Sequence, residues 1–190
     1  MGIEFNAPQE LNALSYPLYG SSLIEASAGT GKTYTIAALY VRLILGHGGQ
    51  SAFVQPLAPP QILVMTFTKA ATQELIDRIQ KRLADIAQAL RQNTNADGDP
   101  LVQGLLQSYS SQEEKNNAAW RLFEASNQMD EACVLTIDAW CQRVLKEYAI
   151  LTGQPFDEEL SVQEQEIQTN ATEDFGEGTF THCLKTMPKR

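Results

Sequence analysis

The sequence predicts an α/β fold, in which a parallel sheet is flanked by helices on both sides. Three short apolar runs have the composition of buried strands, and they lie at 23–26, 62–66 and 133–136. Longer segments with apolar residues at helical spacing separate these runs. Because parallel strands are joined by a crossover, usually a helix, the alternation predicts βαβ units.

The composition is that of a globular protein with an uneven charge. At 190 residues and 43% hydrophobic content, the chain can form one domain with a core, or one domain with a tail. Its net charge is −9, but residues 147–184 hold nine acids and no Lys or Arg, while residues 1–146 hold 14 acids and 11 bases. The global charge therefore does not exclude a face that binds nucleic acid.

Neither an export signal nor a membrane span is evident in the sequence. No stretch approaches the ~18 uninterrupted apolar residues that a membrane span requires. The cysteines Cys133, Cys141 and Cys183 lack paired metal-ligand spacing and are expected to be reduced thiols. We therefore expect a cytoplasmic protein with no membrane partner.

Residues 1–20 contain Pro and Gly breaks, which predict an irregular lead-in that packs near the site that follows. Leu23–Ala26 is then expected to be a short buried strand. It leads into Ala26-Ser-Ala-Gly-Thr-Gly-Lys-Thr33, close to the P-loop pattern G-x-x-x-x-G-K-[ST], in which backbone N–H groups at a helix N-terminus face phosphate oxygens. Lys32 is expected to reach the β- and γ-phosphates of ATP, and the Thr33 hydroxyl to help hold Mg²⁺.

Ala26 stands where that pattern has its first glycine, and the alternative interpretation is a helix cap built of small residues. The predicted nucleotide-binding residues are Ala26, Ser27, Ala28, Gly29, Thr30, Gly31, Lys32, Thr33 and Tyr34. Lys32 and Thr33 are the predicted catalytic residues, and Thr33 the predicted metal ligand.

Two long helices are predicted around the second strand. Apolar residues from Ile36 to Ile44 recur at helical spacing, and Gly46 is a C-cap. Residues 47–60 form a loop in which His47 is expected to be solvated. Ile62–Thr66 is expected to be a strand buried on both faces. From Lys69 an amphipathic helix follows, with an apolar stripe of Leu75, Ile79, Leu83, Ile86 and Leu90 and with the exposed ion pairs Glu74–Arg78 and Asp77–Lys81.

Residues 92–130 are expected to form a helical insertion. A turn at 93–100 precedes a short helix to Ser108, and a capping box at Ser111–Glu114 opens a helix to Asn127. Trp120 and Phe123 in this helix are expected in the core. After the third strand, a helix from 137 to 150 is predicted to pack through Trp140, Val144, Leu145 and Tyr148.

Three blocks in order resemble the UvrD-like superfamily 1 DNA helicases, most of all the RecB-type beta subunits of exodeoxyribonuclease V. They are Ala26–Thr33, Thr66-Phe-Thr-Lys-Ala-Ala-Thr-Gln-Glu-Leu75 and Thr136-Ile-Asp-Ala-Trp-Cys141, and the similarity runs from about Pro17 to Leu160. The resemblance implies a RecA-like core, ATP and Mg²⁺ as cofactors, and helicase and exonuclease activity in DNA repair and recombination. It also implies single-stranded DNA and RecC-like and RecD-like subunits as partners.

In that family the second and third blocks contact DNA. Threonine hydroxyls can bond phosphate oxygens, and an aromatic ring offers a face to a base or sugar. The resemblance thus assigns DNA contacts to Thr66, Phe67, Thr68, Thr136, Asp138 and Trp140. The alternative for the second block is a strand-to-helix cap with Phe67 in the core.

The chain departs from the family at several positions. Asp138 stands where the family usually has His, and its carboxylate would repel a DNA phosphate. Trp140 stands where the family usually has Phe, and this change keeps an aromatic surface for stacking. Tyr19 stands where RecB-type chains have Gln, which leaves Gln9 as a candidate adenine contact.

The family's Walker B block is an Asp-Glu pair that follows a strand, and this sequence contains no such pair. An arginine finger is not evident either. We therefore expect an N-terminal piece of a helicase that binds ATP but hydrolyses it negligibly. The predicted divisions are a lead-in at 1–20, the ATP-binding domain at 21–156 and an acidic, poorly ordered tail at 157–190. The alternatives are an unrelated P-loop protein such as a small-molecule kinase, and a non-catalytic interaction fragment.

Overall fold

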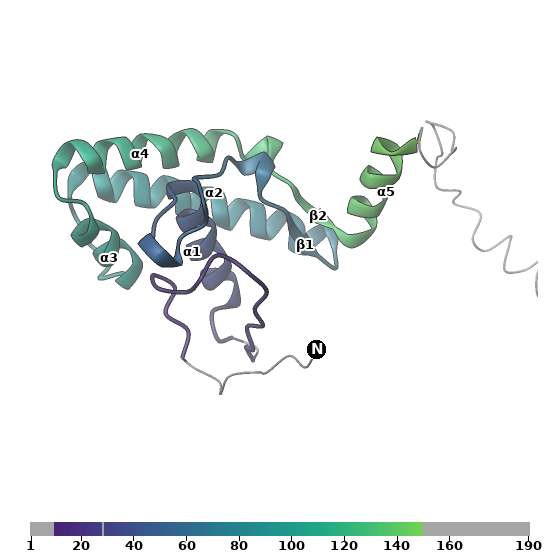
Figure 1. Cartoon of the computed structure of the whole chain (residues 1–190), viewed down its shortest axis with the longest axis horizontal. Helices are drawn as coiled ribbons and strands as arrows, with labels where there is room; N and C mark the ends of the chain where they lie inside the picture. Colours follow the sequence, from purple (N-terminus) through teal and green to yellow (C-terminus); the bar gives the residue numbers. More distant parts are fainter. Residues whose placement is uncertain (1–9, 28, 150–190) are drawn as a thin grey trace, which may run out of the picture. The chain divides into compact units, whose positions relative to one another are not determined.

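The computed structural model describes residues 10–27 and 29–149, and it divides at Arg143 into two compact units. The first unit holds nearly all of the regular structure found in the described residues (Figure 1). Its helices are α1 (Lys32–Leu45), α2 (Lys69–Gln92), α3 (Pro100–Ser108) and α4 (Gln112–Asn127), its strands are β1 (Val64–Thr66) and β2 (Val134–Thr136), and short 3₁₀ turns lie at Gly49–Ser51, Pro59–Gln61 and Met129–Glu131. Helix α5 (Ile137–Glu147) begins in this unit and ends beyond Arg143.

The sheet consists of β1 and β2, which pair in parallel with Val64 opposite Val134 and Thr66 opposite Thr136. The connection between them runs through α2, α3 and α4, which confirms a crossover between parallel strands. Val64 and Val134 face the core, but Leu63 is 40% and Met65 52% exposed. The prediction of a strand buried on both faces was therefore wrong for β1, because α2 covers one face and no described element covers the other.

The predicted strand at Leu23–Ala26 does not form. Residues 21–27 have no regular secondary structure and are exposed, with Leu23 72% accessible to solvent. A strand is stable only when its backbone groups pair with a neighbour, and in the described part of the chain β1 pairs with β2 alone.

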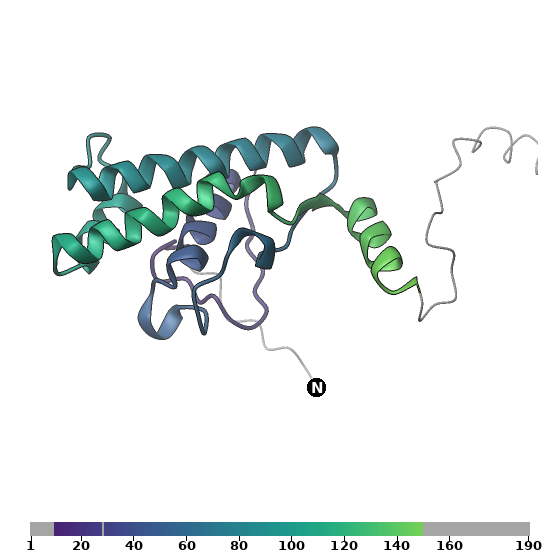
Figure 2. The ribbon, with the colours of Figure 1, turned by 90° about the horizontal axis from the view of Figure 1, so that it is seen from above.

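The buried cluster is formed mainly by residues of α1, α2, α3 and α4. Figure 2 shows from above how these helices lie against one another. The predicted stripe of α2, from Leu75 to Leu90, is buried. Opposite it, α4 presents Ala118, Ala119, Leu122 and Ala125. Alanines bring the two helices close together, and Gln80 of α2 donates to the Ser126 carbonyl of α4 (3.1 Å).

Trp120 and Phe123 were predicted in the core, and this was wrong: they are 61% and 39% exposed. Each follows a buried residue of α4 by one position, and one position is a rotation of about 100° around a helix. The two rings lie 6.2 Å apart, and the Arg91 guanidinium lies 5.0 Å from the Phe123 ring centre.

Local end signals set the helix boundaries. Gly46 ends α1 with φ of 62°, as predicted. The capping box at the start of α4 is present: Ser111 Oγ accepts from the Glu114 N–H (3.1 Å) and Glu114 Oε2 from the Ser111 N–H (3.4 Å). Of the predicted exposed ion pairs, Glu74–Arg78 forms (2.6 Å), whereas Asp77 instead accepts from Gln73 (2.9 Å).

The lead-in is fixed by Arg42 of α1, a fully buried arginine that pairs with no carboxylate in the described part of the chain. Its guanidinium donates to the carbonyls of Ala13 (2.9 Å), Tyr16 (2.6 Å) and His47 (3.2 Å), and to Ser51 Oγ (2.9 Å). Arg42 lies ten residues, or about 15 Å, beyond the start of α1. The described part of the lead-in therefore packs against the far end of α1, not near the predicted nucleotide loop.

His47 is half-buried, contrary to its predicted solvated position. Burial and the neighbouring Arg42 charge lower its pKa, and its ring lies 6.3 Å from that of Tyr109.

Helix α5 ends three residues before its predicted end. No residue within it is buried, so the predicted packing stripe is not seen for the described part of the chain; Leu145 is 47% and Tyr148 49% exposed. The predicted acidic tail, with Cys183, lies outside the described residues. Among the helices described, none has the length and apolar character needed to cross a membrane.

Candidate functional site

The loop between Ala26 and α1 is tightly curled. Gly29 (φ 78°) and Gly31 (φ 84°) adopt left-handed conformations that favour glycine, which explains their place in the sequence. Thr30 donates its N–H and hydroxyl to the Ser27 carbonyl (3.4 and 2.8 Å). Ala28, a predicted site residue, lies outside the described residues.

The Lys32 side chain folds back over this loop. Its ammonium donates to the carbonyls of Ala26 (3.2 Å) and Ser27 (2.6 Å) and remains exposed to solvent. No described carboxylate pairs with it. The ammonium is thus held at the mouth of the loop by neutral oxygen atoms, and an anion of higher charge can compete for it.

The N-terminus of α1 has no side-chain cap and no acidic residue in its first turn. Thr35 donates to the Gly31 carbonyl (2.9 Å), but no described residue accepts a hydrogen bond from the N–H groups of Thr33 and Tyr34. In contrast, Thr68, Asp99 and Ser111 cap α2, α3 and α4 with their side chains. Within the described residues, the first turn of α1 therefore offers donors that have no acceptor, together with the positive end of a helix dipole, to an anion.

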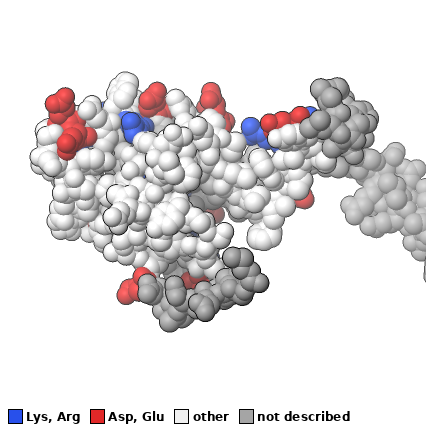
Figure 3. All heavy atoms as spheres, viewed as in Figure 1, with Lys and Arg blue, Asp and Glu red and all other residues white. Residues whose placement is uncertain are grey.

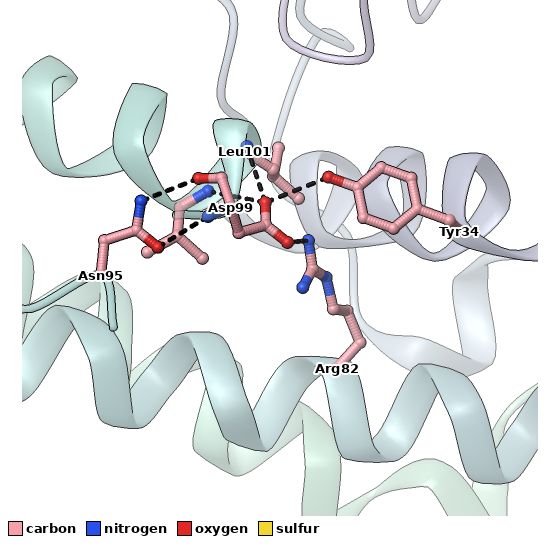
Figure 4. A network of polar contacts seen from close by, with 6 residues as sticks. Tyr34, Arg82, Asn95, Asp99 and Leu101 are labelled. Carbon is pink, nitrogen blue, oxygen red and sulfur yellow. Dashed lines mark hydrogen bonds and ion pairs between the residues drawn. The ribbon is translucent and has the colours of Figure 1, made fainter. Parts of the chain in front are cut away.

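Tyr34 makes a contact that the sequence did not predict (Figure 4). Its hydroxyl donates to Asp99 Oδ1 (3.0 Å), and Arg82 pairs with Asp99 Oδ2 (2.6 Å). Burial and the Asp99 hydrogen bond raise the pKa of Tyr34. Burial also opposes ionisation of Asp99, but Arg82 outweighs it and holds the pKa of that carboxyl below its usual value. The only local signal was Asp99 itself, an N-cap residue before Pro100.

A second cluster lies at the carboxyl ends of β1 and β2. Thr66 and Thr136 are register partners there. Thr66 Oγ1 is engaged inside the protein with Thr72 Oγ1 (2.6 Å) and the Thr68 carbonyl (3.2 Å). Thr68 and Thr136 accept from the N–H groups of Ala71 (3.1 Å) and Ala139 (3.2 Å).

A threonine hydroxyl has one proton and two lone pairs, so Thr68 and Thr136 each keep a donor. Thr68 is exposed and Thr136 is buried. Of the three threonines, only Thr68 is both exposed and left with a hydroxyl proton that no described residue accepts.

Phe67 is 88% exposed, so the alternative interpretation that places its ring in the core is wrong. Asp138 is exposed in the first turn of α5, and Trp140 is half-buried. The capping hydrogen bond of α5 comes from Thr136, and no described hydrogen bond involves the Asp138 carboxylate. The rim of the sheet thus carries an exposed ring, an exposed hydroxyl and one carboxylate.

Neither cluster has the donor set of a protein-held metal site. The described residues contain no group of three or more His, Cys, Asp or Glu side chains that could hold a metal ion. Figure 3 shows acidic and basic groups standing apart on one face, without a continuous basic stripe there. Gln9 lies outside the described residues, and Tyr19 is 60% exposed.

Comparison with known proteins gives one consistent result. Residues 6–187 match the UvrD/REP helicase N-terminal domain. The chain is 46% identical over 168 residues to the RecBCD enzyme subunit RecB of Escherichia coli (strain K12), which is 88% of this chain and 14% of that protein. It is 39% identical over 171 residues to the subunit of the same name from Haemophilus influenzae, covering 87% of this chain and 14% of that protein. A Buchnera aphidicola subunit is 35% identical over 167 residues, again 88% of this chain and 14% of the relative. The chain thus spans about one seventh of the length of these curated relatives.

Proposed function

The chain belongs to the UvrD/REP helicase N-terminal domain family, and from this premise we propose that it is the ATP-binding, N-terminal part of a RecB-type DNA helicase subunit. In the intact protein, β1 and β2 would belong to a RecA-like sheet, and ATP hydrolysis would drive movement along single-stranded DNA. That protein would act in the cytoplasm, in DNA repair and recombination, as a helicase and exonuclease subunit with RecC-like and RecD-like partners.

The observation that carries the ATP-binding proposal is the arrangement of hydrogen-bond donors in the loop before α1. Two left-handed glycines, an ammonium held only by neutral carbonyls, and the N–H groups of Thr33 and Tyr34, which have no acceptor among the described residues, meet at one helix N-terminus. Phosphate would take the Lys32 ammonium from two neutral carbonyls and add charge-assisted hydrogen bonds. No described carboxylate stands in the way, so the residues present fit a triphosphate.

Mg²⁺ would be held mainly by the nucleotide. Because the described residues contain no cluster of metal ligands, the ion would keep most of its waters, with the Thr33 hydroxyl and phosphate oxygens as its other ligands. The ion would neutralise phosphate charge, while Lys32 and Thr33 would orient the terminal phosphates.

Single-stranded DNA would cross the rim at the carboxyl ends of β1 and β2. A ring as exposed as that of Phe67 suits stacking with a base, and Thr68 keeps a hydroxyl proton for a phosphate oxygen. Thr66, Thr136 and Trp140 would mainly shape the rim. A small-molecule kinase, the other P-loop class considered, would have no use for an exposed ring at this position.

Titration calorimetry with Mg-ATP tests the nucleotide site. We expect Lys32→Ala to weaken binding tenfold to a hundredfold, since charge-assisted hydrogen bonds are worth roughly 1.5–3 kcal/mol. Lys81→Ala removes another exposed lysine, on α2, and should leave the affinity unchanged. Equal affinity in the Lys32→Ala variant and the parent chain contradicts the assignment.

Fluorescence anisotropy with a short oligonucleotide tests the DNA rim. Phe67→Ala should lose about fivefold or more in affinity, because base stacking contributes about 1–3 kcal/mol. Trp120→Ala is the matched control: it deletes an exposed aromatic ring of α4, away from the strands. Equal losses in the two variants would indicate nonspecific aromatic binding and not a site at the strand ends.

A further inference from the structure

Three side chains from three helices tie the predicted nucleotide loop to the helical insertion (Figure 4). Tyr34 belongs to the first turn of α1, directly after Lys32 and Thr33. Arg82 comes from the middle of α2, and Asp99 precedes α3. Besides its ion pair with Asp99, the Arg82 guanidinium lies 4.9 Å from the centre of the Tyr34 ring.

Asp99 Oδ1 is where the two ends of this network meet. It accepts from the Tyr34 hydroxyl (3.0 Å) and also from the N–H groups of Leu101 (2.8 Å) and Val102 (3.3 Å), which begin α3. A movement of the Tyr34 hydroxyl would therefore alter the hydrogen bonds that the N–H groups of Leu101 and Val102 donate to the same oxygen.

The backbone of Asp99 is held as firmly as its side chain. Asn95 accepts from the Asp99 N–H (2.9 Å) and donates its amide to the Asp99 carbonyl (3.0 Å). The carboxylate and the Arg82 side chain are 15% and 18% exposed, so solvent screens their charges only partly. The Asp99 carboxylate is thus held in place by several contacts, and its hydrogen bond with Tyr34 positions the start of α1.

Tyr34 contacts both the predicted nucleotide loop, through its backbone, and Asp99, through its side chain. Its backbone N–H has no acceptor among the residues that the structure describes, and its hydroxyl donates to Asp99 Oδ1. A helical turn is stiff, so phosphate that orders this N–H also restricts where the hydroxyl can lie. Coupling of this kind is reciprocal, and a well-held Asp99 in turn favours the binding-competent loop.

We propose that Tyr34, Asp99 and Arg82 are positioning residues that couple nucleotide binding at the loop before α1 to the start of α3. The proposal rests on the ATP-binding function proposed above and extends it, since occupancy of the loop would be sensed in the helical insertion. The competing explanation is a fixed brace between helices, which adds stability but does not respond to nucleotide.

Hydrogen–deuterium exchange of the full 190-residue chain, with and without saturating Mg-ATP, separates the two explanations. In the parent chain, Mg-ATP should slow exchange roughly two- to tenfold at Leu101 and Val102, in addition to the loop, as expected for one hydrogen bond gained or firmly held. Tyr34→Phe keeps the ring but removes the hydroxyl, and it should lose the slowing at α3.

Two further variants control for fold and charge. Asp99→Ala removes the Oδ1 acceptor and should keep the slowing at the loop but lose the response at α3, whereas Asp97→Ala changes an exposed acid of the same turn and should keep both. A melting curve of each variant shows whether it folds.

The outcomes distinguish failure of this proposal from failure of the proposed function. If Mg-ATP protects the loop but leaves α3 unchanged, or if Tyr34→Phe keeps the response at α3, the network is only a brace and the coupling is refuted. If Mg-ATP protects neither segment of the parent chain, ATP binding fails and the coupling fails with it.

Discussion

Replacement of Asp138 by histidine should tighten the binding of single-stranded DNA. Asp138 is exposed in the first turn of α5, two residues after Thr136, the residue that ends β2 on the rim. A carboxylate there opposes any phosphate that passes the rim, whereas histidine can donate a hydrogen bond and carries a positive charge below pH ~6.5.

The size of the effect follows from exposure. At roughly 5 Å in water, two unit charges interact by about 0.8 kcal/mol, so exchanging a repulsion for an attraction is worth up to about 1.6 kcal/mol, or roughly fifteenfold. At pH 8 only the repulsion is removed, and the gain falls to about fourfold. Salt should diminish both gains, because exposed charges are screened.

The same substitution carries a modest cost in stability. An acid in the first turn of a helix is worth about 0.3–1 kcal/mol through the helix dipole. The α5 cap itself should survive, because Thr136 and not Asp138 accepts the capping hydrogen bond. Asp138→Ala, which removes the charge without adding a donor, isolates the electrostatic part.

Anisotropy titrations at pH 6 and pH 8, in low and high salt, test this prediction beside a melting curve. Asp130→His is the matched control, because Asp130 is an exposed acid that precedes β2 at its opposite end. If Asp138→His lowers thermal stability without any gain in DNA affinity at pH 6, the rim is not where DNA passes. An equal gain in Asp130→His would mean that only net charge matters.

Three other outcomes are expected. A phosphate-release assay should detect negligible ATPase activity in this chain, even with single-stranded DNA, because a supplied arginine finger alone accounts for about 10³–10⁵ in rate in related enzymes; turnover that Lys32→Ala abolishes would contradict this. Arg42→Met should destabilise the chain by about 1–3 kcal/mol for each carbonyl left without its donor, measured by urea denaturation, whereas Arg121→Met on the exposed face of α4 should change little. Because the folded-state pKa of Asp99 lies below its ordinary value of 3.8, its contribution to stability is present above pH 3.8 and is lost as the pH falls through the folded value; acid unfolding of Asp99→Asn should lack this component, and that of Asp97→Asn should retain it.

The predictions that were confirmed concern features within a few residues of one another. The buried stripe of α2, the capping box at Ser111 and the C-cap at Gly46 each depend on groups one or two turns apart. The left-handed conformations of Gly29 and Gly31 were not predicted, although glycine is the residue that adopts such conformations most easily. The binding roles of the site residues stay predictions.

The predictions that were wrong depend on neighbours far along the chain. Leu23–Ala26 has the composition of a strand, but a strand forms only beside a partner, and none of the described residues pairs with it. Trp120 is a large aromatic residue of a type that is common in protein cores. Its exposure is decided by which side of α4 faces α2.

By itself, then, the sequence determined the helices, the ends that local caps set, the small-residue loop with Lys32 and the family. Only the tertiary structure decided that Tyr34 meets Asp99, 65 residues away, and that the buried Arg42 holds carbonyls of the lead-in 26 and 29 residues before it. The physical reason is that a helix end is set by hydrogen bonds between near neighbours, whereas these polar contacts require three or more elements to be packed first. No spacing in the sequence records which distant groups that packing brings within bonding distance.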